Sequence, residues 1–155
     1  MRPVSKRERE NAGEDMASCV SFPNDGEINV ASGRKEKTFE YDQVFNVDSK
    51  QSDVYEEISG LVTSVLDGYN VCIFAYGQTG SGKTFTMQGG TDPATWGLIP
   101  RALSKILETS EGMRADGWQW TLTASFLEIY NEQLRDLLHD AKKDGQAPSY
   151  GAHPP

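Results

Sequence analysis

The stretch Asn70–Met87, NVCIFAYGQTGSGKTFTM, constrains the fold more than any other part of this sequence. Val71–Tyr76 is a continuous apolar run of β-favouring residues, which is typical of a strand buried on both faces. The run leads directly into Gly77–Thr84, which fits the P-loop pattern G-x-x-x-x-G-K-[ST]. Lys83–Met87 can then open a helix. A strand, a glycine-rich loop and a helix form the context in which this pattern binds phosphate.

The residue types of this loop suit a nucleoside triphosphate. Glycines let the backbone turn tightly and direct successive N–H groups into one concavity, which attracts a polyphosphate. Lys83 would contact the β- and γ-phosphates, and the Thr84 hydroxyl would be a ligand of Mg²⁺. The expected binding residues are Gly77, Gln78, Thr79, Gly80, Ser81, Gly82, Lys83 and Thr84.

Helical periodicity appears on both sides of the loop. Gln51–Leu66 and Leu98–Thr109 each carry one apolar stripe, and Asp67-Gly68 supplies a stop with the glycine placed for a left-handed cap. Helix, turn, buried strand, phosphate loop and helix together indicate half of an α/β fold with a parallel sheet.

The flanking segments give weaker signals. Ala17–Phe22 and Glu27–Ala31 predict a hairpin, since a strong turn signal separates them. We expect Phe39, Tyr41, Val44 and Phe45 to pack in the core. Trp118–Tyr130 alternates like a long strand that enters the sheet interior, and Asn131–Leu138 indicates a short turn or helix. Residues 139–155 lack an apolar stripe, so a disordered tail is expected.

Charge and cysteine content exclude several classes. The net charge of −8 argues against nucleic acid and gives no support to an acidic membrane surface. Only Cys19 and Cys72 are present, so neither a disulfide framework nor a metal site is indicated, and a reducing compartment is expected. Cys72 lies in the apolar run, where an inert buried thiol is the simplest interpretation. No signal peptide or bilayer-spanning run is found, so a soluble intracellular protein is expected.

A P-loop indicates triphosphate binding but not hydrolysis, which needs further parts. No later apolar strand ends in an aspartate that would support Mg²⁺, and D-x-x-G does not occur. Glu128 lies in the predicted long strand and could face a metal, although satisfying a nearby polar group is the more ordinary role. His139 and His153 lie in the polar tail, where catalytic roles are not expected.

Longer motifs around the loop identify a resemblance. Tyr69–Met87 resembles the P-loop region of kinesin motor domains, and its Asn-Val-Cys-Ile variant resembles the minus-end-directed, carboxy-terminal-motor branch. Further family motifs occur in the expected order. They are Phe39–Phe45, Gly97–Ala102, and Ser125–Glu132 followed by Asp136–Leu138. The resemblance covers about residues 36 to 138.

The resemblance implies ATP with Mg²⁺ at Gly77–Thr84, microtubules as partner, and a cytoplasmic, cytoskeletal location. Arg2-Pro3 resembles the end of the family's Arg-x-Arg-Pro motif, which packs on the adenine, and the match to these two residues is weak. Phe85 stands where the family places a side chain beside the base. Stacking on the base and packing in the core are both open for Phe85.

The sequence also departs from the family pattern. Several parts of the family pattern are missing from it. They are the first core strand, the Asn-x-x-Ser-Ser-Arg-Ser-His switch, the Asp-Leu-Ala-Gly-Ser-Glu switch, and the helices that carry most of the microtubule-binding surface. We therefore expect a partial motor domain over residues 1–138, with an incomplete mixed sheet flanked by helices in the P-loop NTPase manner. The family is a microtubule-stimulated ATPase, but this chain lacks the hydrolysis machinery. The expected function is that of a kinesin-like, ATP-binding microtubule motor present as a fragment. The alternative is a non-enzymatic, truncated nucleotide-binding or interaction module. An unrelated P-loop kinase or GTPase is disfavoured by the longer motifs.

Overall fold

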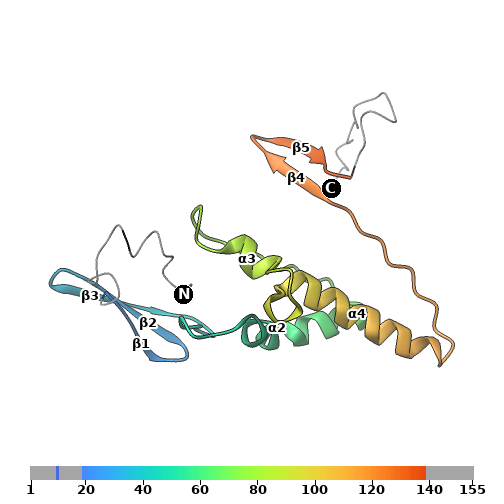
Figure 1. Cartoon of the computed structure of the whole chain (residues 1–155), viewed down its shortest axis with the longest axis horizontal. Coiled ribbons are helices and arrows are strands. Elements are labelled where there is room, and N and C mark those ends of the chain that lie inside the picture. The colour runs from blue at the N-terminus through green and yellow to red at the C-terminus, as the bar shows by residue number, and fades with distance from the viewer. Residues whose placement is uncertain (1–9, 11–18, 139–155) are drawn as a thin grey trace. The chain divides into compact units, whose positions relative to one another are not determined.

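The computed structural model describes residue 10 and residues 19–138, and it divides into two units, Met1–Asp116 and Gly117–Pro155 (Figure 1). Arg2, Pro3 and the tail after residue 138 lie outside the described residues. The helices and strands are, in chain order, β1 Val20–Asn24, β2 Glu27–Ser32, β3 Lys35–Glu40, α2 Gln51–Leu66, α3 Lys83–Met87, η2 Pro93–Thr95, α4 Leu98–Arg114, β4 Leu127–Tyr130 and β5 Gln133–Asp136.

The first unit begins with an antiparallel three-stranded sheet in the order β1-β2-β3. The first turn is fixed by the Gly26 N–H, which donates to Asn24 Oδ1 at 2.8 Å, so the predicted hairpin is confirmed. After β3 the chain returns to this turn, where the Val44 N–H donates to the Asp25 carbonyl at 2.6 Å. Val44 is buried as expected, whereas Tyr41 is exposed, which corrects its assignment to the core.

Helix α2 has the predicted bounds because both of its ends are defined by local sequence. At its start the Lys50 N–H donates to Asp53 Oδ2 at 2.8 Å, and this hydrogen bond is the main reason why the pKa of Asp53 is lowered. At its end Gly68 adopts φ 93°, and the Tyr69 N–H donates to the Ser64 carbonyl at 3.0 Å. This is the left-handed glycine cap that Asp67-Gly68 predicted.

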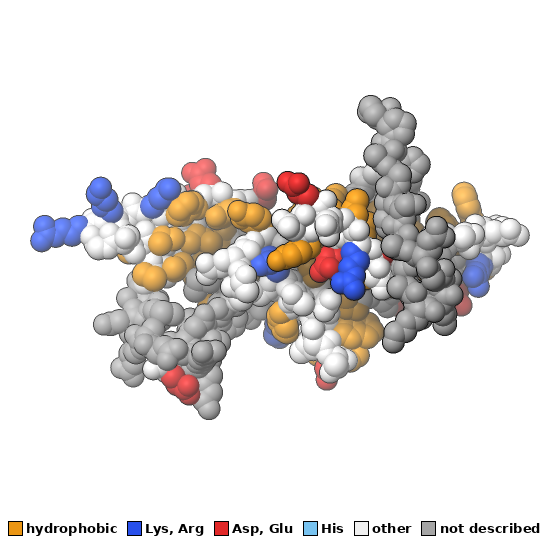
Figure 2. All heavy atoms as spheres, turned by 90° about the horizontal axis from the view of Figure 1, so that it is seen from above, with side chains coloured by type: hydrophobic (Ala, Val, Ile, Leu, Met, Phe, Trp, Pro, Cys, Tyr) orange, Lys and Arg blue, Asp and Glu red, His pale blue; other side chains and the backbone are white. Residues whose placement is uncertain are grey.

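Helix α4 packs against α2 (Figure 1). Val62 of α2 and Leu98 of α4 are buried. The helix continues to Arg114, beyond the predicted end at Thr109. Each helix is apolar over a wider arc than this contact covers. The large apolar side chains left exposed on the two helices are Leu61, Val65, Ile99, Leu103 and Leu107. Hydrophobic side chains are accordingly visible at the surface in Figure 2.

The run Val71–Tyr76 forms no strand, which corrects the prediction of a doubly buried one. Phe74 is 87% exposed, Tyr76 is 100% exposed, and Cys72 is an exposed free thiol. A central strand needs hydrogen-bonding neighbours on both edges, and no segment among residues 19–138 supplies one. All strand pairs in this part of the chain are antiparallel, so the expected parallel sheet is not formed within it.

The second unit contains a two-stranded hairpin, in which Leu127 pairs with Asp136 and Tyr130 with Gln133. The predicted long strand is therefore only four residues in β4. The prediction of a short turn or helix over Asn131–Leu138 is correct for the turn at Asn131-Glu132, whereas residues 133–136 form the strand β5 instead. Asn131 and Glu132 have φ of 49° and 63°, as a two-residue hairpin turn of type I′ requires. Asparagine is common in such a turn, whereas glutamate is not, so the sequence at this turn matches the type I′ hairpin pattern only in part. Across the residues that the structure describes, every helix is too short or too polar to span a bilayer.

Candidate nucleotide-binding loop

The loop between Tyr76 and α3 is built on glycines in backbone conformations that other residues rarely adopt. Gly77, Gly80 and Gly82 have φ of 153°, 80° and 100°. A Cβ atom on Gly77 would lie 2.5 Å from Ser81 Oγ, so a side chain at this position would displace the opposite side of the loop. The glycine spacing therefore produces the tight turn that the sequence predicted.

The loop leaves backbone N–H groups available for a ligand. Within residues 78–82, all of which the structure describes, the only amide with a hydrogen-bond acceptor is that of Ser81, which donates to the Gln78 carbonyl at 3.1 Å. The amides of Gly80 and Gly82 keep their hydrogens unpaired. Such unpaired N–H groups on a turn of this kind suit the oxygens of an anion.

Lys83 folds back over the loop from the first position of α3. Its Nζ donates to the carbonyl oxygens of Gly77 and Gln78 at 2.7 and 2.8 Å. The ammonium group is thus held beside the loop by neutral acceptors. A phosphate oxygen is a stronger partner for an ammonium than a carbonyl is, so an anion in the loop could recruit this side chain.

Helix α3 is held in place by segments that precede and follow it. Gln51 Nε2 donates to the Phe85 carbonyl at 2.6 Å, and the Gly97 N–H donates to the Gln88 carbonyl at 3.1 Å. Arg101 Nε donates to the Trp96 carbonyl at 2.9 Å, which closes the loop that follows α3. A Cβ on Gly97 would lie 2.5 Å from the Thr86 carbonyl. The sequence predicted none of these supports from local pattern, although Gly97 and Arg101 lie in a motif that the resemblance had marked.

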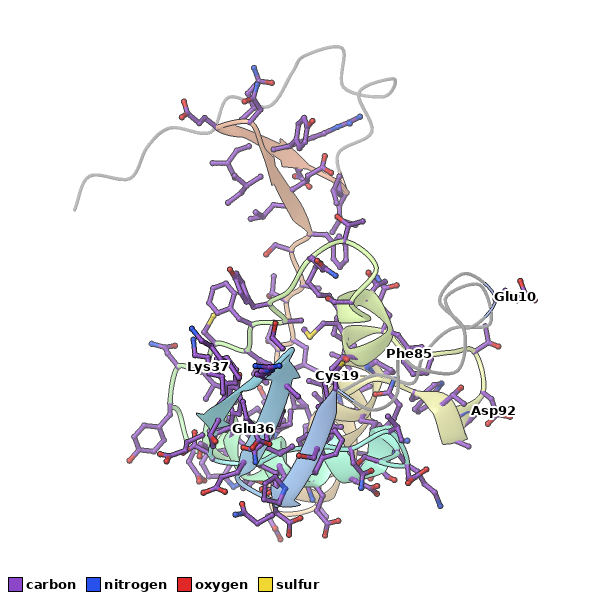
Figure 3. All side chains as sticks on the ribbon, turned by 90° about the vertical axis from the view of Figure 1, so that its left-hand side faces the viewer. Glu10, Cys19, Glu36, Lys37, Phe85 and Asp92 are labelled. Atoms are coloured by element: carbon purple, nitrogen blue, oxygen red, sulfur yellow. The ribbon has the colours of Figure 1, made fainter. Side chains whose placement is uncertain are left out.

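The structure brings the predicted residues 77–85 together in one loop and the short helix that follows it. Thr84 is exposed at the start of α3, and Phe85, labelled in Figure 3, is 56% exposed. Arg2 and Pro3 lie outside the described residues. Glu128 lies exposed in β4. A separate open hollow is lined by Glu40, Tyr41, Asp42 and Gln43, and its two carboxylates disfavour a polyphosphate.

The donor set at the loop fits Mg²⁺ bound together with phosphate. Among residues 10 and 19–138, no three or more His, Cys, Asp or Glu side chains gather where they could hold a metal ion. Mg²⁺ in nucleotide sites keeps several waters and takes most other ligands from phosphates, so one hydroxyl ligand such as that of Thr84 suits this class of site.

Three comparisons with known proteins all find similarity to kinesins. A sequence profile of the Kinesin family, described as "Kinesin motor domain", matches residues 1–150. The chain is 51% identical over 153 residues to "Carboxy-terminal kinesin 2" of Xenopus laevis, covering 89% of this chain and 23% of that protein. It is 56% identical over 110 residues to "Kinesin-like protein KIFC1" of Rattus norvegicus, covering 70% of this chain and 16% of that protein.

A solved structure is also similar, with a TM-score of 0.75 and 35% sequence identity over 89% of this chain and 39% of that one. It is described as "Structure of a fast kinesin: Implications for ATPase mechanism and interactions with microtubules". This likeness confirms the expected fold class, and carboxy-terminal kinesins among the relatives confirm the expected branch. The chain spans less than a quarter of the length of these two curated relatives. The profile match and the relatives show that this chain belongs to the kinesin motor domain family.

Proposed function

We propose that this chain binds ATP with Mg²⁺ at Gly77–Thr84 and is the nucleotide-binding part of a microtubule motor. The observation that carries the proposal is the position of Lys83, whose Nζ lies on the carbonyls of Gly77 and Gln78 beside unpaired loop amides. A cation and several N–H donors thus converge on one turn, as polyphosphate binding requires.

Each loop residue has a distinct role in this proposal. The amides of Gly80 and Gly82 donate to phosphate oxygens, and Lys83 exchanges its carbonyl acceptors for the β- and γ-phosphates. The Thr84 hydroxyl coordinates Mg²⁺, which neutralises charge between the phosphates. Gln78, Thr79 and Ser81 contribute the rest of the loop backbone.

The base of the nucleotide would lie beside Phe85. Phe85 is 56% exposed, which favours stacking of its ring on the base over packing in the core. Arg2 and Pro3 are proposed as a further contact to the adenine, on family resemblance alone.

The microtubule enters the proposal through the family. The similar solved structure is described in terms of ATPase mechanism and interactions with microtubules. We propose the same track for the motor to which this nucleotide loop belongs, and with it a cytoplasmic, microtubule-associated location.

A second candidate is a non-enzymatic nucleotide-binding or interaction module. It is favoured by the exposed apolar surface of α2, α4 and residues 71–76. The two candidates differ in turnover. Under the second, microtubules do not accelerate ATP hydrolysis by the purified 155-residue chain. A measurable microtubule-stimulated rate would exclude it.

The binding proposal is tested by equilibrium titration with a fluorescent ATP analogue in the presence of Mg²⁺. Lys83→Ala should weaken binding about 10- to 100-fold, because hydrogen bonds to charged groups contribute roughly 1.5–3 kcal/mol. Lys105→Ala is the matched control, since Lys105 is an exposed lysine of α4 and its removal changes the net charge equally. Equal affinities of Lys83→Ala and wild type would show that the loop is not the binding site.

The metal role of Thr84 is tested in the same titration. Thr84→Val removes the hydroxyl at constant shape and should weaken binding only when Mg²⁺ is present. Thr84→Ser keeps the hydroxyl and should bind like wild type. An equal loss for Thr84→Val with and without Mg²⁺ would contradict metal coordination by this residue.

A further inference from the structure

The helix that presents Lys83 and Thr84 is too short to hold itself in place. Helix α3 has five residues, Lys83–Met87, and begins after Gly82. Isolated helices of this length are not stable in water, so the orientation of the first turn depends on contacts made by the rest of the helix. The residues that hold α3 therefore set where the Lys83 and Thr84 side chains begin.

Gln51 makes one of these contacts across 34 positions of the sequence. It is the first residue of α2 and only 9% exposed, and its Nε2 donates to the Phe85 carbonyl at 2.6 Å. The carbonyls in the last turn of a helix lack intrahelical partners. The Thr84 carbonyl accepts from the Gln88 N–H at 2.8 Å, but Gly89 turns away with φ 76°, and Phe85 relies on the Gln51 amide instead.

The backbone of Gln51 is itself held in place. The neighbouring Lys50 N–H donates to Asp53 Oδ2 at 2.8 Å, and the Asp53 N–H donates to the Lys50 carbonyl at 3.1 Å. This reciprocal pair closes the first turn of α2 around Gln51. A buried side chain on a fixed backbone can transmit the position of α2 to α3.

We propose that Gln51 is a positioning residue for the phosphate-binding loop. By holding the Phe85 carbonyl, it fixes α3 and thereby raises the affinity of the loop for nucleotide. The proposal rests on nucleotide binding at Gly77–Thr84 and deepens it, because it places part of the control of that site in α2.

Two substitutions separate the hydrogen bond from packing. Gln51→Ala removes the donor and should weaken binding of the fluorescent ATP analogue about tenfold, which corresponds to roughly 1.4 kcal/mol. Gln51→Glu keeps the shape but places a carboxylate oxygen against a carbonyl oxygen at neutral pH. The opposing carbonyl and the burial both favour the protonated acid, so its pKa should be raised.

The decisive readout is the affinity of Gln51→Glu relative to wild type at two pH values. The loss should be large at about pH 8 and much smaller at about pH 5.5, where the protonated carboxyl group can donate to the Phe85 carbonyl. Gln119→Glu, at an exposed position of the second unit, is the control, and its affinity relative to wild type should be the same at both pH values. If Gln51 served only to pack against its neighbours, the affinity of Gln51→Glu relative to wild type would not recover at the lower pH.

Amide hydrogen exchange without nucleotide gives a second readout. The Thr86 N–H, which donates to the Gly82 carbonyl at 2.9 Å, should exchange faster in Gln51→Ala than in wild type. Unchanged exchange at Thr86, or a Gln51→Glu deficit that is the same at both pH values, would overturn the positioning role. If wild type binds no nucleotide, the proposed function fails, but the exchange comparison still decides whether Gln51 holds α3.

Discussion

Substitution of Gly77 by alanine tests the geometry of the loop. Gly77 has φ 153°, and an added Cβ would lie 2.5 Å from Ser81 Oγ and 3.2 Å from Ser81 Cβ. A backbone held in a sparsely populated region costs about 1–3 kcal/mol for a residue with a side chain, and the contact with Ser81 adds to this. We expect Gly77→Ala to weaken nucleotide binding at least about tenfold.

Two other glycines separate the contributions. At Gly80, φ is 80° but nothing lies within 4 Å of an added Cβ, so Gly80→Ala should show the backbone cost without the clash. Gly60 lies inside α2 with open space around it, and Gly60→Ala should raise the free energy of unfolding by about 0.5–1 kcal/mol while leaving binding unchanged.

A double-mutant cycle then isolates the clash. Ser81→Ala removes the Oγ atom that Gly77→Ala would meet, so the double variant should lose less affinity relative to Ser81→Ala than Gly77→Ala loses relative to wild type. The assay is the titration with the ATP analogue, with circular dichroism to compare helix content. Wild-type affinity in Gly77→Ala, or full additivity of the two changes, would refute the loop geometry described here.

Three further predictions concern the stability of the chain and its exposed surface. The Tyr55 hydroxyl is buried without a hydrogen-bond partner, and burial raises its pKa, so Tyr55→Phe should keep or raise the free energy of unfolding by up to about 1 kcal/mol. Because a raised pKa contributes stability that is lost as pH rises, the advantage of the phenylalanine variant should grow above about pH 10 in urea titrations. The pKa of Asp53 is lowered, so its contribution to stability depends on pH in the opposite direction. This contribution is present above the unfolded pKa and disappears as pH falls through the folded pKa. Asp53→Asn should therefore show a smaller acid-induced loss of helicity than wild type. Residues 68–82 carry no charge, and an exposed uncharged run such as Val71–Tyr76 can pair as a strand with the same run of another chain. Tyr76→Lys should therefore reduce self-association measured by sedimentation, whereas Tyr41→Lys should not. Equal association of wild type and both variants would contradict strand pairing through this segment.

Local sequence predicted the parts of the fold that local interactions determine. The α2 helix was predicted with its correct bounds because its apolar stripe, Asp53 and Gly68 all act within a few residues of one another. Val71–Tyr76 was predicted as a strand and forms none, since a strand also needs partners that its own sequence does not contain. The hairpin at Asn131-Glu132 was missed because glutamate seldom occupies a left-handed turn position.

The candidate site likewise combines features that local sequence determines with contacts between distant residues. The tight turn at Gly77–Gly82 could be predicted because it depends on the spacing of its own glycines, whereas nucleotide binding by the loop stays a prediction. The contact of Gln51 with Phe85 joins positions 34 residues apart through a backbone carbonyl, so no local pattern could indicate it. Arg101 was quoted only within a family motif, and its hydrogen bond to the Trp96 carbonyl gives that motif a physical role.

The central claim is that ATP binds in the loop Gly77–Thr84, and residue-resolved amide chemical shifts test it most directly. The isotope-labelled chain is titrated with ATP and Mg²⁺, with Lys83→Ala as the matched variant. We expect the largest shift changes at residues 77–84, led by the unpaired amides of Gly80 and Gly82, and their loss in Lys83→Ala. Shift changes that leave this loop unaffected, or that are the same in Lys83→Ala, would contradict it.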